Sequence, residues 1–173
     1  MKKIFVLIFI VIILAVPAFF GIKRIRQSKQ EKPNIINNFK SEATLNIEDK
    51  VYGGKFSHSD DFTELVVQDP SNISGLKIVW EGENQRIYLD DVKKESNKFL
   101  LPEDSFLNLT IKIINQIPSI ELAEVSNDGK YATFEGTVEK HKFTLNCDDN
   151  GYIKEINIPC KNSRITFEYE IQN

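Results

Sequence analysis

Short segments of alternating apolar and polar residues, separated by turn signals, run through most of this chain. Segments 43–47 and 164–171 alternate almost strictly, which predicts strands with one buried face. Asn, Asp and Gly clusters at 127–129 and 148–151 favour hairpins between neighbouring strands. The chain is therefore expected to fold mainly as an antiparallel sheet of nine or ten strands. The predicted strands are 43–47, 51–57, 62–68, 76–80, 87–89, 121–126, 130–140, 142–147, 152–158 and 164–171.

One segment departs from this pattern and predicts an amphipathic helix. Phe106, Leu109, Ile113 and Ile117 recur at helical spacing, and Pro118 follows as a stop signal. A sheet of nine or ten short strands usually curls, and one apolar helix is enough to cover its concave side. We therefore expect a mainly β fold of the α+β type, a curved antiparallel half-open barrel with this helix across its mouth. The charged stretch before the helix, at 90–99, is expected to be a loop.

The first thirty residues carry a membrane-targeting signal. An unbroken apolar run of seventeen residues, 4–20, lies between two lysines and a basic cluster at 23–29. As a helix this run spans roughly 25 Å, close to the minimum for one membrane crossing. The expected layout is a transmembrane anchor or signal segment at 1–22, a stalk at 23–38 that becomes helical near 35–39, and a β domain at 39–173.

Retention of this segment as an anchor is the preferred interpretation. The tripeptide 16–18 is a poor cleavage site, and the first thirty residues contain no cysteine that could carry a lipid. The basic downstream flank alone would place the domain in the cytoplasm, but long domains translocate largely regardless of such charge. We expect a single-pass protein of the cell membrane with its domain on the extracytoplasmic side.

The domain itself is strongly acidic. Residues 33–173 contain 15 Lys and Arg against 24 Asp and Glu, a net charge of −9, although the whole chain has a net charge of only −3. Such a domain repels nucleic acids and anionic lipid headgroups, so no nucleic-acid partner is expected. Basic or apolar partners fit this charge better.

Catalytic and metal-binding signatures are missing from the sequence. It has only two histidines and no CxxC, HExxH, GxSxG or glycine-rich phosphate loop. The Ser-His-Ser-Asp-Asp stretch at 57–61 is interpreted as a polar hairpin turn, and the Asp-Asp-Asn stretch at 148–150 as a plain turn without the remaining ligands of a calcium loop. We expect no enzyme, no metal and no cofactor.

The two cysteines are expected to be free thiols. A turn centred on Asn150 and Gly151 would place Cys147 opposite Lys154, which leaves Cys160 roughly 20 Å further along the strand. A disulfide needs Cα atoms within about 7 Å of each other.

Element order and short local motifs resemble the LolA/LolB/LppX-like lipoprotein-carrier superfamily over residues 38–171. The motifs are VYGGKF at 51–56, ISGL at 73–76, Leu101-Pro102 before the helix and GYIKEI at 151–156. The similarity is strongest to small clostridial members, which include a spore-germination lipoprotein that binds and activates a cortex-cleaving amidase. This chain differs from lipoprotein members in lacking the lipid-bearing cysteine.

The resemblance implies a non-enzymatic, extracytoplasmic binding protein, and two functions remain open. One is binding of a protein partner through free strand edges, with a cell-wall hydrolase in sporulation or germination as the implied partner. The other is carriage of lipid or lipoprotein acyl chains in an apolar cavity under a helical lid, although the same helix stripe would equally serve as plain core. The candidate ligand-binding residues are Trp80, Ile87, Phe106, Leu109, Ile113, Phe134 and Phe143.

Overall fold

The computed structural model describes residues 34–82, 84–89, 92–95 and 101–169. They form eleven strands, two 3-10 turns and one helix. The strands are β1 (Phe39–Ile47), β2 (Lys50–Ser59), β3 (Phe62–Asp69), β4 (Lys77–Glu81), β5 (Asn84–Leu89), β6 (Val92–Glu95), β7 (Ala123–Asn127), β8 (Tyr131–Val138), β9 (His141–Asp148), β10 (Ile153–Ile158) and β11 (Ser163–Glu168), and the other elements are η1 (Ser71–Ile73), α2 (Phe106–Gln116) and η2 (Pro159–Lys161).

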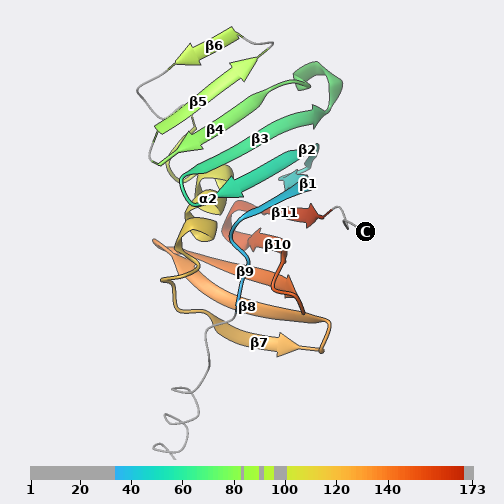
Figure 1. The fold of residues 1–173 in the computed structure, drawn as a ribbon, viewed down its shortest axis with the longest axis vertical. Coiled ribbons are helices and arrows are strands. Elements are labelled where there is room, and N and C mark those ends of the chain that lie inside the picture. The colour runs from blue at the N-terminus through green and yellow to red at the C-terminus, as the bar shows by residue number, and fades with distance from the viewer. Residues whose placement is uncertain (1–33, 83, 90–91, 96–100, 170–173) are drawn as a thin grey trace, which may run out of the picture. The chain divides into compact units, whose positions relative to one another are not determined.

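All eleven strands belong to one antiparallel sheet, in the order β6-β5-β4-β3-β2-β1-β11-β10-β9-β8-β7 (Figure 1). The sheet is open, with β6 and β7 at its two edges. The prediction of a mainly β, antiparallel, open fold with one helix is therefore confirmed. The predicted anchor at 1–22 lies outside the described residues, and within the described part of the chain no helix is long and apolar enough to cross a bilayer.

The chain order explains the position of the helix. Six strands run as a meander from β1 to the β6 edge, and five run from the β7 edge back to β11, which pairs with β1 in the middle of the sheet. The connection from β6 to β7 joins opposite edges, so it must cross the sheet, and α2 lies in this connection (Figure 1).

Strand alternation and the helix stripe bury the same interior. Residues at every second position of the strands, such as Leu45, Leu65 and Leu145, are fully buried together with Leu109 and Ile113 of α2. Ser105 caps the start of the helix, because its hydroxyl accepts a hydrogen bond from the backbone N–H of Asn108 at 3.3 Å. The helix ends next to Pro118, as predicted.

The expectation of a loop at 90–99 is wrong in part. Val92–Glu95 forms the edge strand β6, in which Val92 pairs with Leu89 and Glu95 with Arg86. This stretch has no alternating pattern, since two lysines stand at its centre. Backbone pairing with β5, rather than side-chain pattern, makes it a strand.

The expectation that the chain becomes helical near 35–39 is also wrong. Residues 34–38 are irregular, and Phe39 already belongs to β1. The N–H of Ile36 donates a 2.9 Å hydrogen bond to the carbonyl of Gly151, in the turn between β9 and β10. A Cβ atom on Gly151 would lie 2.1 Å from the carbonyl oxygen of Asn34, so the entering chain packs where only glycine leaves room.

Candidate functional site

The structure brings the predicted ligand-binding residues together between α2 and the sheet. Six of the seven are buried side chains of one hydrophobic core, and Ile87 is half-buried and packs against it. They come from β4 (Trp80), β5 (Ile87), α2 (Phe106, Leu109 and Ile113), β8 (Phe134) and β9 (Phe143). Their place in the core accounts for the apolar pattern, and their binding of a ligand remains a prediction.

A network of hydrogen bonds, most of them buried or partly buried, connects the start of α2 to this core. The indole N–H of Trp80 donates to Asn108 Oδ1 at 2.9 Å, and Asn108 Nδ2 donates to the carbonyls of Leu101 and Pro102 at 3.2 and 2.9 Å. The N–H of Leu101 in turn donates to Gln85 Oε1 at 3.1 Å. A buried indole N–H needs a hydrogen-bond acceptor, and the helix itself provides it.

Strand β7 is one of the two edge strands of the sheet, and it is exposed. All five of its residues are exposed, and Val125 retains 51% of its surface area. Its pairing with β8 shifts register between Glu124 and Ser126, so Val125 sits in a β-bulge. In the neighbouring strand Tyr131 is 40% exposed. An edge with unpaired backbone groups and exposed apolar side chains is suited to accept an added strand.

The surroundings of this edge are acidic. Glu121, Glu124, Asp128 and Glu135 are exposed around β7 and on the facing strand β8, and Lys130 lies 5.0 Å from the ring centroid of Tyr131. The excess of carboxylates matches the net charge of the domain. It would attract a basic segment and repel an acidic one.

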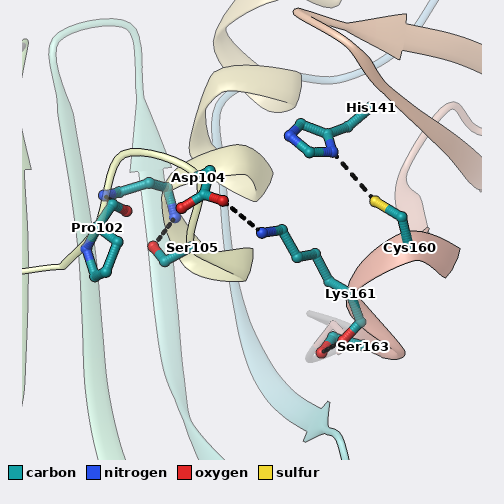
Figure 2. Close-up of polar contacts among 8 residues, drawn as sticks. Pro102, Asp104, Ser105, His141, Cys160, Lys161 and Ser163 are labelled. Atoms are coloured by element: carbon teal, nitrogen blue, oxygen red, sulfur yellow. Dashed lines mark hydrogen bonds and ion pairs between the residues drawn. The ribbon is translucent and has the colours of Figure 1, made fainter.

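A second polar cluster lies where the start of α2 meets β9 and η2 (Figure 2). Asp104 forms an ion pair with Lys161 at 2.9 Å, and His141 Nδ1 lies 3.2 Å from the sulfur of Cys160. The hydrogen bond and charge of Lys161 lower the pKa of Asp104. The prediction that both cysteines are free is confirmed: Cys160 is exposed and Cys147 is buried.

The sequence analysis did not predict the contact of His141 with Cys160, although the position of the β9–β10 turn sets the register that places them opposite each other. In the β9–β10 hairpin, Asn157 pairs with Thr144. Continuing that register by three residues on each strand brings Cys160 opposite His141.

The other histidine lies in the core. His58 is buried in β2, its Nδ1 lies 2.6 Å from Thr63 Oγ1, and its ring lies 6.0 Å from that of Phe39. The stretch 57–61 forms the end of β2 and its turn into β3, as predicted. Within the described residues, no group of three or more His, Cys, Asp and Glu side chains could hold a metal ion.

No protein-family model matches the chain, and no curated protein matches it. A chain of the Pseudomonas aeruginosa MucA/MucB complex is similar in structure at 12% identity and a TM-score of 0.47, over 76% of this chain and 50% of that one. A LolA superfamily protein from Nitrosomonas europaea is similar at 14% identity and a TM-score of 0.38, over 69% of this chain and 61% of that one. A chain of the complex of the CwlD amidase with the GerS lipoprotein from Clostridioides difficile is similar at 15% identity and a TM-score of 0.36, over 79% of this chain and 84% of that one.

This chain thus spans about half the length of the MucA/MucB chain that it matches. All three identities are below 25% and all three TM-scores are below 0.5. At these values the similarities do not assign the chain to a family or a function.

Proposed function

We propose that this protein is a non-enzymatic binding module of the cell envelope that docks a protein partner on the β7 edge of its sheet. The observation that carries the proposal is the exposure of all five residues of β7, with Val125 at 51%, beside the acidic side chains of the β7–β8 hairpin. A partner strand would pair with the free backbone groups of β7 and cover Val125. The bulge at Val125 limits the strands that can be added, which favours a selective partner.

The proposed partner presents a basic extended segment. The described domain belongs to a region of net charge −9, and the exposed carboxylates in and around β7 include Glu121, Glu124, Asp128 and Glu135. Opposite charge would speed the encounter and reject acidic strands. A cell-wall hydrolase, such as an amidase acting in sporulation or germination, is the partner class that the resemblance of the sequence favours.

The proposed location is the extracytoplasmic face of the cell membrane, with residues 1–22 as a single-pass anchor. The apolar run 4–20 and the absence of a lipid-bearing cysteine in the first thirty residues support it. A tethered domain can hold a partner at the membrane. It cannot carry cargo freely between membranes, which places the lipid-carrier function second.

That second function, binding of acyl chains beneath α2, would use the apolar residues that converge there. Trp80, Phe106 and Phe143 belong to this group, and α2 would act as a lid that opens for the ligand. The two functions differ in what the protein retains on purification, so one experiment separates them.

The experiment compares two lysine variants of exposed valines in the full-length protein, purified from membranes of its source cells. V125K places a charge on the free edge, whereas V51K places the same charge on β2, which is paired on both sides. We expect a partner protein to co-purify in stoichiometric amount with the wild type and with V51K, and to be absent from purified V125K. Retention of that protein by V125K, or recovery of acyl lipid in its place, would overturn the proposal.

A further inference from the structure

An exposed thiol lies beside an imidazole at the end of the β9–β10 hairpin. His141 is the first residue of β9, and Cys160 lies in η2, directly after β10. His141 Nδ1 and Cys160 Sγ are 3.2 Å apart and face each other (Figure 2). A nucleophile and a base within hydrogen-bond reach form the basic arrangement of an activated thiol.

Charged groups from three elements surround this imidazole. Asp104, before α2, and Glu139, in the turn between β8 and β9, both interact electrostatically with His141. Their carboxylates form ion pairs with Lys161 and Lys112 at 2.9 and 2.5 Å. The positive charge that the ring would gain on taking the thiol proton therefore lies near two carboxylates.

Asp104 and Glu139 already form ion pairs with lysines, but one nitrogen of the His141 imidazole lacks a hydrogen-bond partner among the described residues. This nitrogen, Nε2, is buried. Lys140 also belongs to the charged surroundings of Glu139. The sulfur of Cys160, in contrast, is on an exposed residue that a small molecule can reach.

The second cysteine provides a contrast within the same chain. Cys147 is only 2% exposed, and burial, followed by the charge of Asp148, raises the pKa of its thiol to about 12. A thiol in this state is inert, because the thiolate is the nucleophile. The two cysteines therefore differ in access and in the presence of a neighbouring base.

We propose that Cys160 is a thiol–disulfide exchange site for low-molecular-weight disulfides, with His141 as its base. The thiol proton passes to His141 Nδ1, and the Cys160 sulfur attacks one sulfur of the disulfide. The Cys160–S bond forms as the S–S bond of the disulfide breaks, and the leaving thiolate takes the proton from the imidazolium. Cys160 is oxidised to a mixed disulfide while half of the disulfide is reduced to a thiol.

The experiment follows the reaction of the full-length protein in detergent with the neutral probe 4,4′-dithiodipyridine. The folded protein is expected to react rapidly through one thiol, and the second thiol is expected to react only after unfolding. C160S should abolish the rapid phase, whereas C147S should leave it unchanged. Mass analysis should locate the adduct on Cys160.

The rate separates an assisted thiol from a merely exposed one. In the C147S chain near neutral pH, the folded protein should react on the order of tenfold faster than the same chain in denaturant. H141N should remove this advantage and steepen the fall in rate as the pH decreases from about 8 to about 6, because Asn cannot accept the thiol proton.

Two controls keep the result interpretable. Thermal unfolding verifies that H141N is folded. D104N removes an exposed carboxylate near the ring, together with its ion pair to Lys161, and should lower the rate by less than H141N does. The proposal is overturned if folded C147S reacts no faster than its unfolded form, or if H141N and D104N both keep the wild-type rate and pH profile.

Discussion

The imidazole of His58 shows how a single buried group sets the response of the fold to acid. Desolvation by burial lowers the pKa of His58, and the charge of Asp60 opposes this only in part. The unfolded chain therefore binds a proton more readily than the folded one just below the ordinary pKa of about 6.5. The contribution of His58 to the free energy of unfolding is fully present above pH 6.5, and it is lost as the pH falls from there through the lowered pKa of the folded state.

Replacing His58 should flatten this decrease. In H58Q the side chain no longer titrates, so the free energy of unfolding should change less between about pH 7 and pH 5 than in the wild type. Denaturant unfolding at several pH values measures it. An equally steep loss in H58Q would show that other groups, and not His58, account for the acid sensitivity.

The contact between Trp80 and Asn108 predicts a second effect at this scale. N108L fills a similar volume but removes the acceptor of the buried indole N–H and the two hydrogen bonds that Nδ2 donates to the carbonyls of Leu101 and Pro102, so the free energy of unfolding should fall by about 1–3 kcal/mol. T110V is the matched control on the same helix, because it removes only a hydroxyl that donates to the carbonyl of Phe106. Equal losses in both variants, measured by denaturant unfolding, would contradict a special role for the contacts of the Asn108 side chain.

Residue patterns in the sequence predicted which side chains are buried better than they predicted which side chains contact each other. The sequence placed Trp80 in the apolar interior, but nothing in it identified its acceptor Asn108, which lies 28 residues away. The contact of His141 with Cys160 was implicit in the hairpin register. Chemistry that arises from two segments is visible only when their pairing is followed to the end of both strands.

At the scale of the element, two adjacent glycines in β2 show how a strand accommodates a bulge. The pairing of β2 with β3 shifts register between Gly53 and Gly54. A Cβ on Gly54 would lie 2.4 Å from the backbone carbonyl oxygen of Val66, whereas one on Gly53 would come no closer than 3.4 Å to the Asp69 side chain.

These distances predict opposite tolerances for the same substitution. G54A should lower the free energy of unfolding by about 1–3 kcal/mol, because the clash is with the backbone, which cannot rotate away. G53A should be close to neutral. Thermal or denaturant unfolding of the two variants provides the test, and a G53A loss as large as that of G54A would contradict the assigned register.

Elements with strong side-chain patterns were predicted, and elements made by backbone pairing were not. The helix stripe from Phe106 to Ile117 and the Ser-His turn were identified from the sequence alone. β6 was not predicted because its four residues do not alternate. Residues 35–39 were expected to become helical, although a hydrogen bond from Ile36 to the turn at Gly151 holds this part of the chain. The local sequence pattern does not predict the conformation of a segment whose structure depends on pairing with a neighbouring strand or turn.

At the scale of the molecule, the open antiparallel sheet was predictable and its central pairing was not. Alternation and turn signals led to a curved sheet with one covering helix. The pairing of β1 with β11 joins residues more than one hundred positions apart, and it leaves β6 and β7 as the edges. The identity of the exposed edge, on which the proposed function depends, therefore came from the structure.

The most direct test of this account is in-cell photo-cross-linking of the full-length protein through a photoreactive residue placed at Val125 or, separately, at Val51. Both positions are exposed, at 51% and 61%, but only Val125 lies on a free edge. We predict a discrete protein adduct from position 125, weakened by high salt, and none from position 51. Equal cross-linking from both positions, or an adduct only from position 51, would contradict partner docking on β7.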